Sequence, residues 1–510
     1  MSSESIANPA QQIAAGYVVE GQALELGAVV IDGKTNPAAQ IRIPLATVNR
    51  HGLVAGATGT GKTKTLQVIA EQLSAAGVPV LMADVKGDLS GLSRPGQSND
   101  KITGRAKESG DDNWQATAFP VDFLSLGTKG IGVPVRATIA SFGPILLSKV
   151  LGLNATQEST LGLIFHYAEQ QNYELLDLKD LRAVIGKLTS DDGKADLKSL
   201  GGVSAQTAGV ILRALVNLEA EGADTFFGEP ELKPKDLLRF DDKGRGVISL
   251  LELGAQAARP VLFSTFLMWV LSDLFMTLPE IGDVDKPKLV FFFDEAHLLF
   301  SDASKAFLEQ VEQTVKLIRS RGVGVFFCTQ LPTDVPNQVL SQLGARIQHA
   351  LRAFTPDDQR ALTKTVRTYP KTDVYDLASA LTSLGIGEAI VTVLSERGAP
   401  TPVAWTRLRS PRSLMAAIGD DAIGTAAKAS PLQAVYGETK DRESAYEKIE
   451  AEKAKAPAEQ PAAGKHAPEA AKKPGWFSRF VNSRGFQTFL KALGTEIIRN
   501  MFGGGSKRRR

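Results

Sequence analysis

A single cysteine, Cys328, stands in this chain of 510 residues, so an intramolecular disulfide is excluded and an oxidising compartment is not indicated. The first 25 residues contain no continuous apolar stretch of the kind found in secretory signals. The most apolar long segment, residues 261–276, is shorter than the roughly 20 residues that span a bilayer, and Asp273 interrupts it. We therefore expect a cytoplasmic protein in which this segment is a buried helix.

Zinc-binding patterns are also missing, because His51 and His297 have no partners at metal-ligand spacing. Apolar residues make up 43% of the chain and charged residues 22%, which is close to the average for globular proteins and predicts a large core. The length allows one large domain with insertions, or two or three domains.

The segment GATGTGKT fits the phosphate-loop pattern G-x-x-x-x-G-K-[ST], with a strand signal, HGLVAG, before it and a helix-forming segment after it. Its glycines allow successive N–H groups to point at one anion, and the helix adds the positive end of its dipole. Lys62 is expected to contact the β- and γ-phosphates of ATP, and Thr63 to bind Mg²⁺. The alternative is a glycine-rich turn that binds nothing. The residues predicted to contact ATP are Gly56, Ala57, Thr58, Gly59, Thr60, Gly61, Lys62, Thr63 and Lys64.

Two carboxylates follow an apolar run in KLVFFFDEAHLLF. Continuous apolarity predicts a strand buried on both faces, which places Asp294 and Glu295 at its carboxyl end, where ligands bind in open α/β sheets. Asp294 would hold Mg²⁺, mostly through water, and Glu295 would activate the attacking water as general base. The bland alternative is that the pair caps the next helix.

The carboxylate base favours hydrolysis, and the Asn-Lys-x-Asp motif that a small G-protein needs is missing. A kinase of the same fold is not excluded by the sequence. Gln330 ends the next apolar run, GVGVFFCTQ, so its amide is expected near the γ-phosphate unless it is a surface amide. Arginines that stabilise the transferring phosphoryl group can come from the same chain or from a neighbour. The candidates, each with a surface role as the alternative, are Arg319, Arg321, Arg346 and Arg352.

Strand signals alternating with helices predict an α/β fold with a mostly parallel sheet. The predicted organisation is a strand-rich lead-in (1–48), an ATPase core (49–410) with a helical insertion at about 143–238, and a C-terminal extension of the core (411–438), followed by a linker rich in Ala, Lys, Glu and Pro (439–473) and a tail (474–510). In the insertion, Thr156 and Ser204 are expected to cap helices.

The tail is basic and amphipathic. Its apolar residues recur at three- and four-residue steps, and it carries eight basic residues and one acidic residue, a net charge of +7. Such a helix can lie on an anionic membrane or dock on a protein partner, and the terminal KRRR can contact phosphates. A helix that packs back on the core is the alternative. A membrane-peripheral location is therefore a further expectation.

Four segments together resemble the HerA–FtsK superfamily, in particular the bacterial group with a helicase HerA-like C-terminal domain. They are NRHGLVAGATGTGKT, VLMADVKGDLSGL, FFFDEAHLLF and RSRGVGVFFCTQLPTDVPNQVLSQLGARIQHALR, and the resemblance covers about residues 49–408. It implies a RecA-like P-loop core, hexameric rings, and ATP-driven pumping of DNA or protein through the pore. HerA itself carries a β-barrel before this core, whereas fewer than 50 residues precede it here.

The resemblance also implies roles for single residues. Lys62 and Thr63 match the phosphate-loop positions, Asp294 and Glu295 the metal-holding and catalytic carboxylates, and Gln330 the sensor glutamine. Arg352 aligns with the arginine-bearing strand after the sensor. The stretch D-x-K-G-[DE] is matched by Asp84, Lys86, Gly87 and Asp88.

Two hypotheses follow. The first, which the motifs favour, is an oligomeric DNA translocase or helicase-like ATPase. The second is an ATP-switched interaction or membrane-associated module that moves no polymer, which the missing barrel, the helical insertion and the tail suggest.

Overall fold

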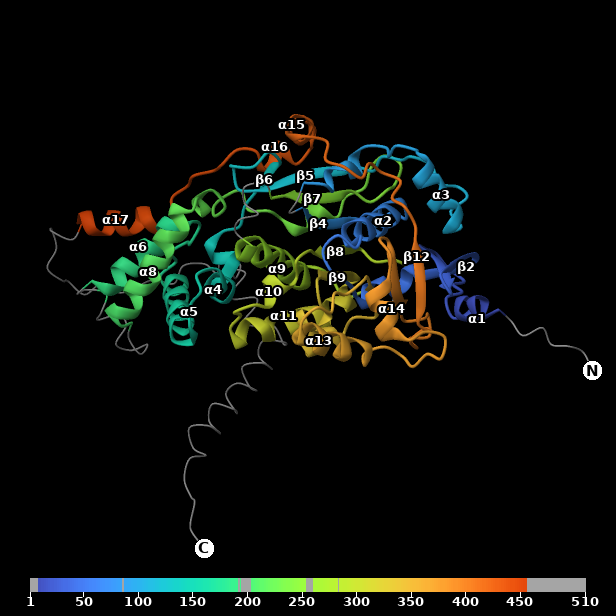
Figure 1. Ribbon diagram of the computed structural model, residues 1–510. Helices are drawn as coiled ribbons and strands as arrows, with labels where there is room; N and C mark the ends of the chain where they lie inside the picture. Colours follow the sequence, from blue (N-terminus) through green and yellow to red (C-terminus); the bar gives the residue numbers. More distant parts are fainter. Residues whose placement is uncertain are drawn as a thin grey trace, which may run out of the picture.

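The computed structural model describes residues 8–84, 87–190, 193, 203–253, 260–282 and 284–455. Lys86, most of the predicted linker and the whole basic tail lie outside these residues. One twelve-stranded sheet organises the fold, in the order β2-β1-β12-β11-β10-β3-β9-β8-β4-β7-β5-β6 (Figure 1). The strands are β1 (Ala23–Ile31), β2 (Lys34–Pro44), β3 (Gly52–Ala55), β4 (Val80–Asp84), β5 (Val121–Leu126), β6 (Val133–Val135), β7 (Ile248–Glu252), β8 (Leu289–Phe293), β9 (Val323–Thr329), β10 (Ala345–Gln348), β11 (Glu388–Thr392) and β12 (Ala404–Leu408).

The strands from β10 through β3, β9, β8, β4, β7 and β5 to β6 all run parallel, whereas β11, β12, β1 and β2 complete the sheet with antiparallel pairs. The predicted mostly parallel α/β sheet is therefore confirmed. The predicted lead-in is part of this sheet, since β1 pairs with β12. Its alternation QIRIPL lies in β2, where Ile41 and Ile43 are buried and Arg42 between them is partly exposed.

Helices surround the sheet. They are α1 (Pro9–Ala15), α2 (Lys62–Ala75), α3 (Asp100–Glu108), α4 (Ile139–Val150), α5 (Ala155–Gln170), α6 (Leu178–Thr189), α8 (Ala205–Ala220), α9 (Pro260–Thr277), α10 (His297–Phe300), α11 (Lys305–Ile318), α12 (Asn337–Leu340), α13 (Pro356–Val366), α14 (Leu377–Ser383), α15 (Asp420–Ala429), α16 (Gln433–Tyr436) and α17 (Ala445–Lys455). Because helices cover both faces, the central strands are buried on both sides, which explains their continuous apolarity.

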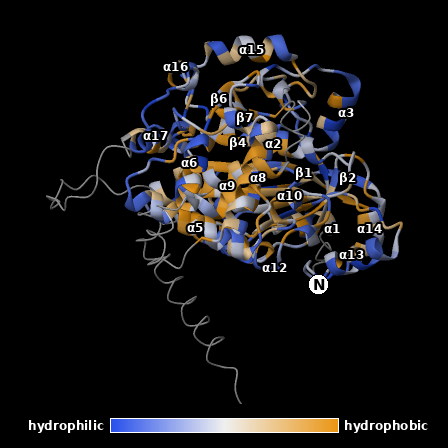
Figure 2. Cartoon of the chain, turned by 90° about the vertical axis from the view of Figure 1, so that its left-hand side faces the viewer, coloured by the Kyte–Doolittle hydropathy of each residue, from blue (hydrophilic) through white to orange (hydrophobic). Residues whose placement is uncertain are grey.

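The residues of β8 show how the core is divided. Phe291 and Phe293 point into the cluster formed with α9 and α11, whereas Val290 and Phe292 point into the cluster formed with α2. This is the two-residue alternation of a strand between two layers. Figure 2 shows hydrophobic residues gathered on α9 and the neighbouring interior elements.

The apolar segment 261–276 forms most of α9, which carries buried residues such as Trp269 and Leu267, as the sequence predicts. Among the described residues, no helix combines the length and apolarity needed to cross a bilayer.

Among the described residues between β6 and β7 are the helices α4, α5, α6 and α8, which lie at the left of Figure 1. They occupy the region predicted as a helical insertion. Ser204 caps α8 as expected, but the cap of α5 is Asn154 rather than Thr156. Asn154 and Gln157 form a reciprocal capping box, which satisfies two backbone donors that a threonine already inside the first turn would not reach.

Candidate functional site

The loop between β3 and α2 has the backbone conformation that its glycines permit. Gly56, Gly59 and Gly61 have φ values of 151°, 83° and 109°, which side chains with a Cβ rarely adopt. A Cβ built at Gly56 would lie 2.5 Å from the His349 Cβ, whereas nothing lies within 4 Å of one built at Gly59. The loop is thus packed against the end of β10 at its start and open at its middle.

Neighbouring strands hold this loop through its backbone. The Gly56 amide donates to the Thr329 carbonyl at 3.2 Å, and the Ala57 amide donates to the Ala350 carbonyl at 2.8 Å. On the far side, the Gly387 amide donates to the Thr60 carbonyl at 3.0 Å. The end of β9, the segment after β10 and the segment before β11 therefore fix the loop over the centre of the sheet.

The lysine of the motif lies over its own loop. Lys62 Nζ donates to the carbonyls of Gly56 at 2.7 Å and Ala57 at 3.2 Å. Thr63 is half-buried in the first turn of α2, next to Lys62. Lys64 instead directs its ammonium to Asp88, 3.4 Å away.

The carboxylates reach the same edge of the sheet as the loop. Only β9 separates β3 from β8, and all three run parallel, so their carboxyl ends lie at the same edge. Burial first, and then the Asp294 carboxylate, raise the pKa of the Cys328 thiol in β9, while Lys62 acts to lower it. Lys62 follows β3 and Asp294 follows β8, so the sheet order places the two predicted site residues at the same edge, on either side of the end of β9.

Glu295 has an unusual backbone and an unsatisfied carboxylate. Its φ is 48°, in the left-handed region that costs a residue with a side chain of order 1–3 kcal/mol. Its Oε2 atom is buried and has no hydrogen-bond partner among the described residues, and the His297 Nδ1 lies 3.4 Å away. Such strain and such an unpaired acceptor are typical of functional sites.

Gln330 and Arg352 border the loop. Gln330 is exposed and follows Thr329, whose carbonyl accepts from Gly56. Arg352 is exposed in the segment after β10, and its Nη2 donates to the Thr58 carbonyl at 3.3 Å. Arg352 is thus the candidate arginine of this chain that contacts the phosphate loop in the described structure.

The other candidate arginines lie elsewhere. Arg346 donates to the Thr368 carbonyl at 3.0 Å. Arg319 and Arg321 form a 3-10 turn just before β9 begins, so they lie at the amino edge of the sheet, opposite the loop. These positions do not fit a role in the site of their own chain. Arg319 and Arg321 lie at the edge where β9 begins, and the Arg346 side chain in β10 reaches the residues that follow α13.

His349 is a site residue that the sequence did not indicate. It directly follows β10, is buried, and forms a hydrogen bond of 2.9 Å between its Nε2 and the Thr65 hydroxyl in α2. Burial and the nearby Lys62 lower the pKa of His349 to about 4, so the ring is neutral at pH 7. In the sequence, His349 could have been singled out only by its place in the predicted strand segment ARIQHALR. It lies one residue before Ala350, whose carbonyl accepts a hydrogen bond from the Ala57 amide of the loop.

A second pair of carboxylates lies farther along the same edge. Asp84 accepts hydrogen bonds from the Gly87 and Leu89 amides, both at 2.7 Å, which shapes the turn of the D-x-K-G-[DE] stretch. Its register partner in β7 is Glu252. Burial, followed by Asp84 and Asp420, raises the pKa of Glu252 to about 8. Glu252 is therefore mostly protonated at pH 7, which the sequence alone did not suggest.

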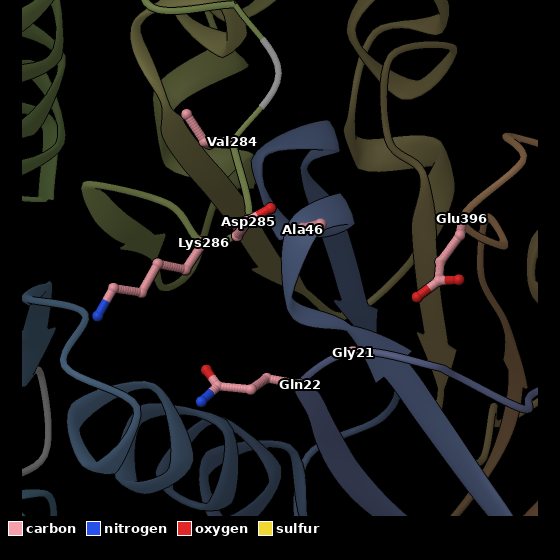
Figure 3. Close-up of a pocket in the computed structure, with 7 residues that line it drawn as sticks. All are labelled: Gly21, Gln22, Ala46, Val284, Asp285, Lys286 and Glu396. Carbon is pink, nitrogen blue, oxygen red and sulfur yellow. The ribbon is translucent and has the colours of Figure 1, made fainter.

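A cavity of about 710 Å³ lies away from this site (Figure 3). Ala46 and Lys286 on its wall precede β3 and β8, so the cavity opens at the amino edge of the sheet. It does not belong to the phosphate loop.

The described residues contain no group of three or more His, Cys, Asp or Glu that could hold a metal ion alone. Thr63 and Asp294 nevertheless fit Mg²⁺ held together with phosphates, since Mg²⁺ usually takes one or two protein ligands and completes its shell with substrate oxygens and water. The open glycine loop and the Lys62 ammonium fit the phosphates themselves.

Several known proteins are similar to this chain in sequence or in fold. The DNA double-strand break repair helicase HerA of Saccharolobus solfataricus is 23% identical over 380 residues, which cover 74% of this chain and 67% of that protein. The unbound bacterial conjugative coupling protein TrwB has a TM-score of 0.52 and 14% identity, covering 80% of this chain and 94% of that chain. TrwB in complex with ADP and Mg²⁺ has the same TM-score, 0.52, with 16% identity, covering 79% and 94%.

The structural likeness to TrwB confirms the predicted RecA-like fold. The model of the family described as helicase HerA-like C-terminal matches residues 30–509. The chain therefore belongs to this family of P-loop ATPases of the HerA–FtsK type.

Proposed function

We propose that this protein hydrolyses ATP to translocate DNA, as an oligomeric motor. The observation that carries the proposal is the arrangement of Lys62, Asp294 and Glu295 at one edge of the sheet, with no hydrogen bond to the Glu295 Oε2 from the described residues. The printed name of the HerA relative supports DNA as the polymer. Family membership supports assembly into a ring.

Each residue has a defined task in this proposal. The loop amides of residues 56–61 and Lys62 bind the β- and γ-phosphates, and Thr63 and Asp294 hold Mg²⁺. Bound Mg²⁺ would neutralise charge that develops on the phosphate oxygens. Glu295 takes the proton from the attacking water through its Oε2, which accepts no hydrogen bond from the described residues. Gln330 orients that water, and Arg352, held at Thr58, stabilises the transferring phosphoryl group.

The first experiment measures ATP hydrolysis by the full chain with and without double- and single-stranded DNA. We expect Mg²⁺-dependent turnover that DNA increases, and DNA binding that weakens steeply as salt rises. Lys62→Ala should abolish turnover, whereas Lys305→Ala, which changes an 81% exposed side chain on α11, should not. ATP hydrolysis that no DNA stimulates at low salt would contradict the DNA motor.

The second experiment measures molecular mass by light scattering with and without a non-hydrolysable ATP analogue. A ring motor requires a mass of several subunits in at least one of the two states. A monomer in both states would contradict assembly while leaving ATP hydrolysis untouched. The predicted tail, residues 474–510, is a further proposed contact with DNA phosphates, a protein or an anionic membrane. Removing it should weaken whichever contact it makes.

A further inference from the structure

Two apolar side chains near the phosphate loop are left in solvent. Phe354 is 86% exposed and Ile386 is 73% exposed, the two highest values among the large hydrophobic residues that the structure describes. Their chain neighbours Leu351 and Leu384 are only 4% and 7% exposed and pack in the cluster under α13 and α14. The fold therefore buries the side chains of Leu351 and Leu384 and leaves those of Phe354 and Ile386 exposed to solvent.

Both segments are tied to the phosphate loop. Phe354 lies four residues after Ala350, whose carbonyl accepts from Ala57, and two residues after Arg352, which donates to Thr58. Ile386 precedes Gly387, whose amide donates to Thr60. A backbone hydrogen bond of 2.8 Å from Leu351 to Leu381 also joins the segment that carries Phe354 to the helix before Ile386.

The position of each segment is fixed independently of its exposed side chain. The capping box of Thr355 and Asp358 begins α13 directly after Phe354, and Asp358 also accepts from the Phe354 amide at 3.1 Å. Arg105 in α3 donates to the carbonyls of Ile386 at 2.9 Å and Gly387 at 3.0 Å. Both apolar side chains are thus presented from anchored backbone.

The direction of a bound nucleotide follows from the sheet order. The catalytic carboxylates follow β8, which lies on the β9 side of the loop, so the γ-phosphate must point that way. The nucleoside end then extends toward the opposite side, where β10 and β11 lie. Phe354 follows β10 and Ile386 precedes β11.

We propose that Phe354 and Ile386 form the nucleobase subsite, in which the base stacks on the Phe354 ring and Ile386 packs against it. The inference rests on the proposed function, since it concerns the substrate of the same site. An aromatic ring recognises the face of a base and not its hydrogen-bonding edge. The pair therefore favours purine over pyrimidine nucleotides and discriminates little between ATP and GTP.

The test compares a ligand that has a base with one that has none. Equilibrium affinities of the full chain for ATP and for inorganic tripolyphosphate are measured with Mg²⁺ present. Phe354→Ala should weaken ATP binding about tenfold, because stacking of a base on an aromatic ring is worth ~1–3 kcal/mol. Tripolyphosphate affinity should stay unchanged. Phe354→Trp should restore ATP binding, and Ile386→Ser should weaken it in the same selective way.

A matched control is Phe240→Ala, because Phe240 is 56% exposed and lies in the turn that precedes β7, at the amino edge of the sheet. This variant should leave both affinities unchanged. Equal loss of ATP and tripolyphosphate binding in Phe354→Ala, or no loss of either, would overturn the subsite. Loss of oligomer mass with wild-type ATP affinity would also overturn it and would assign the two side chains to an interface between copies.

The two proposals fail in different ways. If the unmodified chain binds neither ATP nor tripolyphosphate, the proposed function is wrong. If it binds both, and Lys62→Ala abolishes both, the phosphate site stands whatever the Phe354 variants show.

Discussion

At the scale of single residues, the backbone and the carboxylate of Glu295 are the features most typical of a catalytic position. Its left-handed backbone is held on both sides by hydrogen bonds, from the Ala296 amide to the Cys328 carbonyl and from its own amide to the Asp294 carboxylate. These contacts fix the strained backbone, and the carboxylate Oε2 has no hydrogen-bond partner among the described residues. Strain that surrounding contacts maintain is a common property of catalytic positions.

Glu295→Gln is expected to bind ATP with nearly normal affinity and to hydrolyse it about 10²–10⁴-fold more slowly, because the amide cannot accept the proton from water. Single-turnover hydrolysis and equilibrium nucleotide binding separate the two effects. Normal turnover in this variant would remove Glu295 from the role of general base. Glu309→Gln, on the partly exposed side of α11, serves as the control.

Thr65 and His349 illustrate a positioning contact, since neither is placed to touch the phosphates. Thr65→Val keeps the shape of the side chain but removes its hydrogen bond to the buried imidazole. We expect the affinity for ATP to fall about three- to tenfold, which corresponds to a net hydrogen bond of about 1 kcal/mol. The rate at saturating ATP should change little, and a loss confined to that rate would contradict a positioning role.

The control for this variant is Thr425→Val in α15. The Thr65 hydroxyl donates to the Gly61 carbonyl, four residues earlier, at 3.3 Å, and the exposed Thr425 donates in the same way to the Asp421 carbonyl at 2.8 Å. Its substitution removes the same kind of helical contact without affecting the phosphate loop.

At the scale of elements, the C-terminal segment joins the phosphate-loop helix to the helical insertion. Ser413 and Arg412 donate their amides to the buried Glu71 of α2, at 3.0 and 2.8 Å. Farther along, α17 packs on α6 (Figure 1). The Tyr173 hydroxyl, in the segment before α6, donates to Glu452 of α17 at 2.8 Å. The ordered structure therefore extends into the segment whose composition predicts a linker.

Ile449 is the residue on which the docking of α17 depends most clearly, since it is only 1% exposed. Ile449→Ala should weaken this docking by about 2–4 kcal/mol, the usual cost of such a truncation in a core. Amide hydrogen exchange should accelerate in α17 and in the facing part of α6, while α2 remains protected. Glu450→Ala, which removes only an exposed ion pair with Lys453, should leave exchange unchanged, and equal effects of the two variants would contradict the assignment.

At the scale of the whole molecule, three buried groups contribute to the dependence of stability on pH. Burial lowers the pKa of His51 to about 4, against 6.5 for a free histidine, and burial with Lys62 does the same for His349. Between these values the two histidines bind more protons in the unfolded chain than in the folded one, so their contribution to stability falls as pH decreases from 6.5 toward 4.

Glu252 acts in the opposite direction. Its folded pKa of about 8 exceeds the ordinary value of 4.5, so the folded state holds a proton that the unfolded state releases, and stability falls as pH rises through this range. Above pH 6.5 the two histidines no longer oppose this effect. Of these three groups, Glu252 alone should lower stability by about 2 kcal/mol between about pH 6.5 and 8.

Glu252→Gln removes the titrating group and should flatten this decline, making the variant more stable than the unmodified chain at about pH 8. Thermal unfolding of both proteins between about pH 5 and 8.5 measures the difference. An unchanged slope on the alkaline side would show that Glu252 is not the group that holds the extra proton. The uncharged amide still fills the same space beside Asp84.

Local pattern determined much of this protein. The spacing in GATGTGKT and the apolar run before Asp294 predicted two strands, a helix and the two segments of the site. Local sequence was sufficient here because strand burial and loop conformation depend on the residue types at consecutive positions. The strands β5 and β6 were not predicted, and Asn154 replaced Thr156 as a cap, because short strands and helix ends carry weak local signals.

Only the tertiary structure decided what depends on strand order. It placed β9 between the loop and the carboxylates, sent Arg319 and Arg321 to the opposite edge, and brought His349 beneath the loop. It also paired Asp84 with Glu252, which is remote in the chain, and so raised the pKa of a glutamate that looks ordinary in sequence. Distances between residues remote in the chain arise from packing, and no local pattern encodes them.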